Sequence, residues 1–380
     1  MIIIRELLIL ATVITCVCGD FMMRGTADEA TVCSLNVWGL KYITKSRKSR
    51  IRRLARDLPT SNCDIIALQE LFVGSDFEEL QEYTQRTHPF SVWFKSGVVG
   101  SGLAIFSKFP VVESWYAPYR MSGQFREWLH GDWFAAKGIA HARISLNSGM
   151  DLDVITTHLI ANYGKKGDIY LLQRYTQTYE LTRYISRLGS EAFVLMGDFN
   201  YDTGHPAFTS VMENGLFTKY WFERVPVGPT FNLPSSANHK RREPEQAIDH
   251  CFYSGQLKLR NHSLVFQDGY SDHAGVQATF KWSRGAGNSK RRPSNYFALH
   301  TMMTLLSEEI HRLDRLHARL SLHFFIVTVI VVVSLWLWTR SKWPLVLLVM
   351  YWTYQAFVLW IFQAQERSAL EQLWNEWSLY

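Results

Sequence analysis

One stretch decides the fold: residues 192–200 read Ala192-Phe193-Val194-Leu195-Met196-Gly197-Asp198-Phe199-Asn200. Its first five residues are apolar and include β-branched and aromatic side chains, a pattern typical of a buried strand. Polar side chains follow at Asp198 and Asn200. Polar residues that directly follow a buried strand of an α/β sheet lie in a cleft at the edge of that sheet. The stretch therefore predicts a buried strand with functional side chains at its end.

The same arrangement recurs along the chain. Short apolar runs lead into polar pieces at Leu35-Asn36, Leu68-Gln69-Glu70, Thr157-His158, Ile248-Asp249 and Ser271-Asp272-His273. Between them, residues 175–188 repeat apolar side chains at helical spacing. Strands that alternate with helices indicate an α/β fold. We therefore expect one α/β domain over residues 30–282.

The composition sets broad limits. The chain has 380 residues, of which 47% are hydrophobic and 19% charged, and its net charge is +6. A single domain usually stops growing at roughly 250–300 residues, so we expect one large domain and an appendage. Basic clusters suit a nucleic acid or an anionic membrane surface. The five cysteines contain no CxxC pair, and we expect neither a zinc site nor a disulfide scaffold.

The apolar residues collect at the two ends of the chain. Residues 1–19 form an apolar segment that suits either a cleaved signal or an anchor. Residues 283–320 contain a basic linker and an amphipathic stretch, which we interpret as a juxtamembrane helix. Residues 321–364 hold two apolar runs, each close to spanning length, and 365–380 form a tail. The pattern predicts a C-terminal transmembrane helical hairpin.

The polar residues at the strand ends form a chemically complete set. Metal-assisted hydrolysis of a phosphodiester needs hard oxygen ligands for Mg²⁺, an imidazole for proton transfer and a carboxylate to orient that imidazole. It also needs neutral donors for the phosphoryl oxygens. Taken singly, each piece is more often a turn or a solvated strand end. Together they indicate phosphodiester hydrolysis.

The ordered pieces resemble the endonuclease/exonuclease/phosphatase superfamily. Within it, Asn36-Val37-Trp38-Gly39 and the segments 96–103, 130–138 and 167–171 resemble the neutral sphingomyelinases, in the branch with two C-terminal membrane spans. The resemblance implies a deoxyribonuclease-like two-sheet β-sandwich flanked by helices. Two departures are the apolar N-terminus and Ile160, which stands where the family often has a second histidine.

The resemblance also implies a role for each site residue. Glu70, Asn36 and Asp272 are the expected metal ligands, for Mg²⁺ with Mn²⁺ as a substitute. His273 is the expected general base, with Asp249 accepting its other ring N–H. The remaining expected site residues surround the phosphate or the leaving oxygen: His158, Asp198 and Asn200, with Lys137 as a substrate contact or, equally, a surface residue.

The expected reaction is hydrolysis of sphingomyelin to ceramide and phosphocholine. The expected partners are sphingomyelin in membranes and anionic lipids; no nucleic acid is expected, and no protein partner can be inferred. The two apolar runs imply a multi-pass membrane protein. The family resemblance implies a cytosolic catalytic domain, and Arg312, Arg315 and Arg319, which precede the first run, modestly favour the same side. A cleaved signal would instead place that domain in a lumen or outside the cell. The alternatives are a nuclease or phosphatase of the same superfamily and a catalytically silent membrane scaffold.

Overall fold

The computed structural model describes the chain from residue 29 onward, with gaps. The described residues are 29–97, 100–121, 135–146, 149–162, 168–190, 192–203, 205, 222–240, 243–282, 296–336 and 343–377. The apolar segment 1–19, the linker 283–295, most of the segment 130–138 and residue 167 lie outside them.

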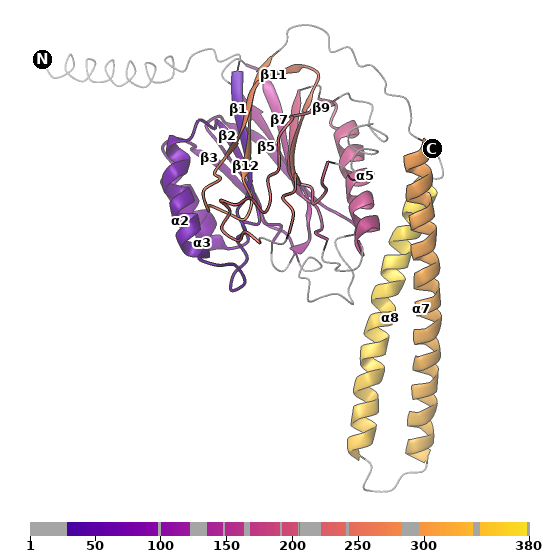
Figure 1. Cartoon of the computed structure of the whole chain (residues 1–380). Coiled ribbons are helices and arrows are strands. Elements are labelled where there is room, and N and C mark those ends of the chain that lie inside the picture. Colours follow the sequence, from indigo (N-terminus) through magenta and orange to yellow (C-terminus); the bar gives the residue numbers. More distant parts are fainter. Residues whose placement is uncertain are drawn as a thin grey trace, which may run out of the picture.

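Two six-stranded sheets pack face to face as a sandwich (Figure 1). The first sheet has the order β11-β12-β1-β2-β4-β3 and the second β5-β6-β7-β8-β10-β9. The strands are β1 (Glu29–Asn36), β2 (Ile65–Gln69), β3 (Phe90–Phe94), β4 (Leu103–Ser107), β5 (Val111–Pro118), β6 (Gly138–Ser145), β7 (Asp151–His158), β8 (Phe193–Asp198), β9 (Phe222–Arg224), β10 (Asp249–Ser254), β11 (Leu257–Val265) and β12 (Gly275–Trp282). The predicted two-sheet α/β sandwich is confirmed.

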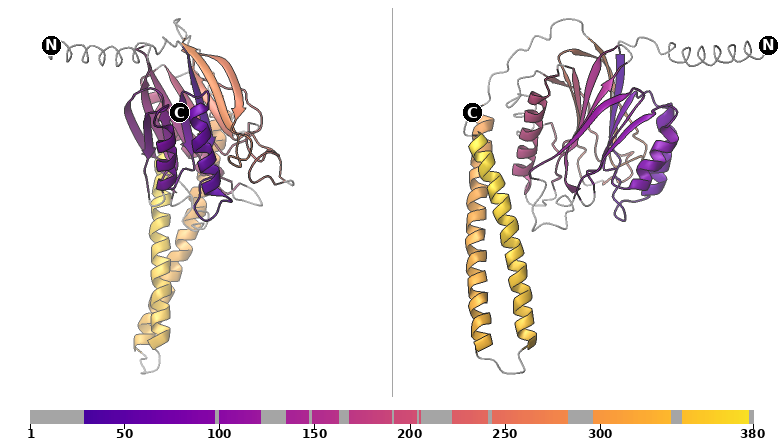
Figure 2. Two further views of the ribbon diagram at one scale, coloured as in Figure 1. Left: turned by 90° about the vertical axis from the view of Figure 1, so that its left-hand side faces the viewer. Right: turned by 180° about the vertical axis from the view of Figure 1, so that it is seen from behind.

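Helices cover the outer faces of the sandwich. α2 (Arg47–Asp57), the 3₁₀ turn Leu58–Thr60 and α3 (Gly74–Thr84) lie against the first sheet, and α5 (Leu171–Arg187) lies against the second (Figures 1 and 2). The helix predicted over 175–188 is α5, which begins four residues earlier because Leu172 is buried as well. Each helix turns one apolar stripe toward a sheet, and this burial stabilises the layered arrangement.

Two parallel strand pairs determine where the polar strand ends lie. β1 pairs in parallel with β2, and β7 pairs in parallel with β8, with His158 opposite Asp198. At Gly197, with φ +148°, an added Cβ would lie 2.0 Å from the carbonyl oxygen of Thr157. Only glycine allows so close a backbone approach. The strands therefore deliver their last side chains to one edge of the sandwich.

A disulfide bond joins Cys33 on β1 to Cys63, just before β2. The cysteine pattern predicted no disulfide scaffold, and this single bond was not predicted. The odd total of five cysteines gave no sign of this pair. Its two members are 30 residues apart in sequence, but one lies on β1 and the other just before the neighbouring strand β2. The bond closes the segment that contains α2. Cys251 is a buried free thiol.

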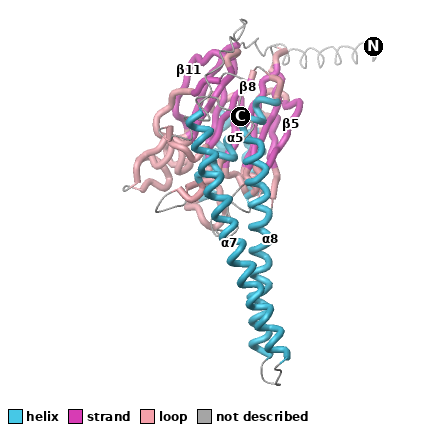
Figure 3. Tube along the Cα trace, turned by 90° about the vertical axis from the view of Figure 1, so that its right-hand side faces the viewer, coloured by secondary structure: helices cyan, strands magenta, loops and turns pink. Residues whose placement is uncertain are grey.

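The C-terminal region is a helical hairpin. α7 (Tyr296–Trp336) and α8 (Trp343–Trp377) lie side by side and extend well beyond the sandwich (Figures 1 and 3). The base of the hairpin packs against α5, where Leu306, Leu313, Leu370 and Trp377 are buried with Tyr179. Residues 296–320 of the stretch predicted as juxtamembrane therefore pack against α5, and residues 365–377 of the predicted tail form the end of α8.

The farther part of the hairpin exposes large apolar side chains, among them Phe325, Ile330, Leu347, Trp352 and Tyr354. Over the residues that the structure describes, no helix has an apolar stretch long enough to cross a membrane. The predicted transmembrane hairpin is thus borne out as a helical hairpin, whereas the two membrane spans and the multi-pass topology are not supported.

Candidate functional site

All of the predicted site residues meet at the edge where β1, β2, β7 and β8 end. Asn36 is at the centre of this cluster. Its side-chain amide donates to Glu70 Oε1 at 3.0 Å and to Asp198 Oδ2 at 2.9 Å, and its Oδ1 accepts the backbone N–H of Trp38 at 3.0 Å. Asn36 is fully buried. It therefore joins the two sheets through a carboxylate from each.

Glu70 follows β2 with its backbone in the left-handed region, at φ 59°. Backbone strain of this kind is typical of functional sites. Burial and the nearby charge of Asp272 together raise the pKa of the Glu70 carboxyl to about 7, although the Asn36 hydrogen bond opposes them. Its Oε2 is buried without a hydrogen-bond partner.

These carboxylates fit a divalent cation. Glu70, His158 and Asp198 offer ligand atoms that all lie within 4.8 Å of one another, and so do Asp198, Asp249 and His273. Buried carboxylates are costly unless a cation or donor compensates them, and oxygen donors suit hard cations such as Mg²⁺. The partnerless oxygen of Glu70 is the position where such a cation would compensate the charge.

His273 and Asp249 form an ordered pair. His273 Nδ1 lies 2.7 Å from Asp249 Oδ2, and the same oxygen accepts the hydroxyl of Thr230 at 2.7 Å. Burial lowers the pKa of His273, but the charges of Asp249, Asp198 and Asp272 outweigh it and raise that pKa well above its usual range. The pair leaves Nε2 directed at the carboxylate cluster, 3.9 Å from Asp198 Oδ2.

His158 and Lys137 form a second polar pair. The Lys137 ammonium lies 3.2 Å from His158 Nε2 and donates to the carbonyl oxygen of Leu159 at 2.9 Å. Burial lowers the pKa of His158 well below its usual range, and the positive charges of Lys137 and His273 lower it further. Lys137 is 2% exposed, so it does not lie on the surface. It is a buried cation beside the carboxylate cluster.

Asp198, Asn200 and Asp272 complete the cluster. Asn200 sits in the left-handed region at φ 51°, its N–H donates to Asp198 Oδ1 at 2.9 Å, and its side-chain amide donates to the Leu159 carbonyl. Burial and the nearby charge of Asp249 together raise the pKa of Asp198 to about 6. Burial also raises the pKa of Asp272. The three carboxyl groups of Asp198, Asp249 and Asp272 thus share one buried region.

Two buried residues that the sequence reasoning missed, Arg50 and Thr230, support the site through hydrogen bonds. Arg50 lies in the basic run Arg50-Ile51-Arg52-Arg53, yet it is 6% exposed and donates to the carbonyl oxygens of Lys45, Val37, Trp38 and Tyr270. It joins the segment after Asn36 to the segment before Asp272. No local pattern distinguishes it from its exposed basic neighbours.

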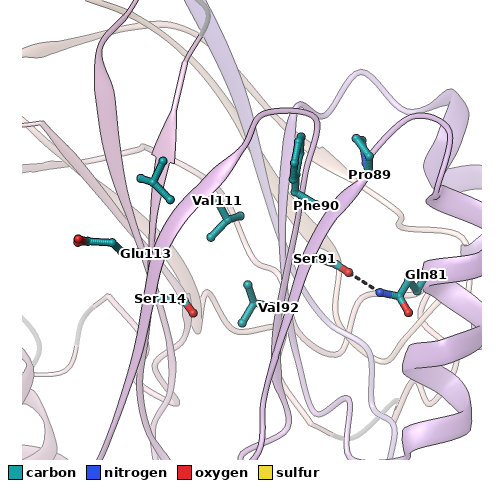
Figure 4. A pocket seen from close by; sticks show the side chains of 9 residues that line it. Gln81, Pro89, Phe90, Ser91, Val92, Val111, Glu113 and Ser114 are labelled. Carbon is teal, nitrogen blue, oxygen red and sulfur yellow. Dashed lines mark hydrogen bonds between the residues drawn. The ribbon is translucent and has the colours of Figure 1, made fainter.

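A surface depression between α3, β3 and β5 contains none of the predicted site residues (Figure 4). Gln81 donates to Ser91 at 2.9 Å within it, and Glu113 and Val112 lie at its rim. It has no cluster of acids and imidazoles. We do not assign it a role, but its exposed side chains are useful controls.

The chain was compared with known proteins. The model of the Endonuclease/Exonuclease/phosphatase family matches residues 33–273. Human sphingomyelin phosphodiesterase 2 is 37% identical over 44% of this chain and 40% of its own length. The inositol phosphosphingolipids phospholipase C of Schizosaccharomyces pombe is 32% identical over 53% of this chain and 48% of its own. The chain therefore spans less than half the length of these two relatives.

Solved structures share the fold. Beta toxin from Staphylococcus aureus with bound magnesium ions is 19% identical with a TM-score of 0.54, over 67% of this chain and 100% of that one. Sphingomyelinase C from Streptomyces griseocarneus is 16% identical with a TM-score of 0.52, over 66% and 99%. Because the family model covers well over half of the sequence and reaches from Cys33 to His273, the chain belongs to the endonuclease/exonuclease/phosphatase family.

Proposed function

We propose that this chain is a phosphodiesterase of the phospholipase C type that hydrolyses sphingomyelin to ceramide and phosphocholine. Two independent facts support the proposal. The relative with 37% identity is named sphingomyelin phosphodiesterase 2. The site combines an oriented imidazole with buried carboxylates and amides, which is the set that hydrolysis of a phosphodiester requires.

The observation that carries the proposal is the 2.7 Å contact between His273 Nδ1 and Asp249 Oδ2. Asp249 accepts the Nδ1–H and so leaves Nε2 to take a proton. We assign His273 as the general base that removes a proton from the attacking water. The water oxygen forms a new bond to phosphorus, the phosphorus–oxygen bond to ceramide breaks, and the ceramide oxygen takes up a proton.

The other side chains position and neutralise the phosphate. Lys137, His158 and Asn200 are assigned to the phosphoryl oxygens and the leaving oxygen. Glu70, Asn36 and Asp272 are assigned as the residues that hold the divalent cation, with Asp198 beside them. Mg²⁺, or Mn²⁺ in its place, supplies charge stabilisation to the phosphoryl group when bound.

We also propose that the hairpin associates with a membrane. Phe325, Leu347 and Tyr354 are each more than half exposed. Large exposed apolar surfaces of this kind mark contacts with a membrane or a partner. A lipid substrate makes the membrane the appropriate partner. Vesicle flotation of the full chain, with and without the hairpin residues changed to serine, checks this assignment.

The decisive experiment measures release of phosphocholine from sphingomyelin in detergent micelles, with Mg²⁺ or with EDTA. His273→Ala should lower turnover by about 10²–10⁴-fold, the usual cost of losing a positioned acid or base. The control is His262→Ala, an exposed histidine on β11. Near-normal turnover by His273→Ala would contradict the assignment.

Other substrates in the same assay separate the rival activities. Plasmid DNA, lysophosphatidylcholine and an inositol phosphosphingolipid all contain the phosphodiester that the site suits. Cleavage of DNA without lipid turnover would make the chain a nuclease. Turnover of the inositol lipid alone would assign it the reaction named for its fungal relatives. If the wild type turns over nothing, the catalytically silent scaffold is favoured.

A further inference from the structure

The loop between β1 and α2, residues 39–46, has an unusual surface. Tyr42 is 92% exposed and Ile43 is 74% exposed, the highest values among the large apolar side chains that the structure describes. Single apolar side chains are common on protein surfaces, and one of them would need no explanation. Two adjacent ones held almost completely in water, next to a binding site, indicate a surface that is covered in use.

The loop is fixed at both ends to the candidate active site. At its start, a Cβ added to Gly39 would lie 2.3 Å from the carbonyl oxygen of Glu70, so the backbone of the loop touches that of a proposed metal ligand. Arg50 donates to the carbonyl oxygen of Trp38, just before the loop, and to that of Lys45, at the other end of the loop. Tyr42 and Ile43 lie between these fixed points. Any surface that the loop contacts is therefore held at a set position relative to the site.

The charge around the apolar pair is positive throughout. Residues 39–56 contain no aspartate or glutamate. Lys41, Lys45 and Lys48 are exposed, and in the part of the chain that the structure describes none of them forms an ion pair. Lys41 and Lys48 line a shallow depression together with Thr44 and Ser46. Cationic and hydroxyl donors around an exposed aromatic and aliphatic pair are complementary to an anionic lipid surface.

The position of the loop agrees with the direction of the hairpin. In Figure 1 the loop hangs from the lower end of the sandwich, the end at which β1 terminates, and α7 and α8 project downward past that end. The two other views in Figure 2 show the same relation. The exposed apolar part of the hairpin and the pair Tyr42-Ile43 thus lie toward the same end of the molecule. One membrane can meet both.

We propose that residues 39–46 form an interfacial loop. Tyr42 and Ile43 insert into the surface of a membrane, while Lys41, Lys45 and Lys48 contact the phosphates of anionic lipids. This contact places the site edge, with Asn36 and Glu70, against the headgroups of the bilayer. The choice of a lipid as the substrate rests on the proposed function. The binding of the loop to an anionic membrane does not.

The first experiment compares two substrates with the full chain. Changing Tyr42→Ser and Ile43→Ser together should lower turnover of sphingomyelin in vesicles at least about tenfold, mainly through a higher apparent KM. Turnover of a water-soluble phosphocholine diester should stay within about twofold. The matched control is Val112→Ser, which changes an exposed apolar residue that lines the depression between α3, β3 and β5. An equal loss on both substrates overturns the proposal, because the loop would then shape the site itself.

The second experiment measures binding of the loop without turnover. Ile43→Cys, in a chain with Cys16 and Cys18 changed to serine, is labelled with a fluorophore sensitive to polarity. Its emission should shift to the blue with vesicles of phosphatidylcholine and phosphatidylserine that lack sphingomyelin. The shift should be absent with phosphatidylcholine alone, and a label at Val112→Cys should not respond. Changing one loop lysine to glutamine should weaken the response about fivefold.

The outcomes distinguish the two proposals. No shift at position 43 with anionic vesicles overturns the interfacial loop, whatever the enzyme turns over. An equal shift with phosphatidylcholine alone overturns the role of the lysines. A clear shift in a chain that releases no phosphocholine supports the loop and contradicts the proposed sphingomyelinase activity.

Discussion

The site edge of the sandwich buries polar side chains, whereas the far part of the hairpin exposes apolar side chains. At the site edge, Asn36, Asp198 and Asp249 are polar and at most 2% exposed. On the hairpin, Phe325 and Tyr354 are apolar and more than 60% exposed. Both arrangements cost free energy in an isolated chain in water. Departures of this kind are expected at functional sites. The site edge is suited to a cation and a phosphate, and the far part of the hairpin is suited to an apolar environment.

The largest expected effect concerns the pair that orients the base. Asp249→Asn removes the negative charge that raises the pKa of His273 and the carboxylate that fixes its tautomer. Turnover should fall by about 10²–10⁴-fold. Because the pKa of His273 falls, more acid is needed to protonate it, so the acid limb of the kcat/KM profile should move to lower pH. A pH–rate profile of both proteins tests this, and an unmoved limb would contradict the role of Asp249.

Substitution of Arg50 tests whether the stability of the buried polar network depends on a residue that takes no part in the proposed reaction. Arg50→Met leaves the carbonyl oxygens of Val37, Trp38 and Tyr270 without their donor, and should lower the free energy of unfolding by roughly 2–4 kcal/mol. Arg50→Lys should recover part of this loss. Chemical denaturation measures both. Arg52→Met is the control, since Arg52 is exposed on the same helix. Equal effects at both positions would show that burial of Arg50 does not matter.

The ionisation of Glu70 should make the stability of the folded protein depend on pH. Its pKa is about 7 in the folded protein, above the ordinary value of 4.5, so the unfolded carboxyl ionises first as the pH rises. Without a divalent cation, this group should lower stability between pH 4.5 and 7 by up to about 3 kcal/mol. Glu70→Gln should remove that part of the pH dependence, and Mg²⁺ should oppose it in the wild type. Thermal unfolding across this pH range tests the prediction. Glu113→Gln is the control, and an unchanged profile in Glu70→Gln would contradict it.

The smallest effect is expected on the hairpin. Phe325→Ser and Tyr354→Ser remove exposed side chains, so the free energy of unfolding in water should change by less than about 0.5 kcal/mol each. Flotation of the full chain with vesicles should fall in the same variants. This combination, neutral for stability but adverse for membrane binding, is the opposite of the result expected at Arg50. A large loss of stability would show that these side chains pack within the protein.

Much of the fold and the site could be predicted because the information is local. Asn36, His158 and Asp198 end an apolar strand and Glu70 directly follows one. Parallel neighbours must end at the same edge of a sheet, so these four residues meet. Arg50 could not be found this way, since its partners are carbonyl oxygens distant in sequence. The roles of α7 and α8 depend on which faces pack against α5, and hydrophobicity alone does not distinguish a stripe that packs on protein from one that faces lipid.

The Cys33–Cys63 bond has a consequence for where this protein can work and how it should be made. The cross-linked segment carries Asn36, the interfacial loop and Arg50, so reduction would loosen the chain around the site. Disulfides persist in oxidising compartments and are rare in the cytosol. The bond would therefore persist if the catalytic domain lies in a lumen or outside the cell, as a cleaved signal would place it. Protein produced in an oxidising compartment and purified without thiols would retain the bond.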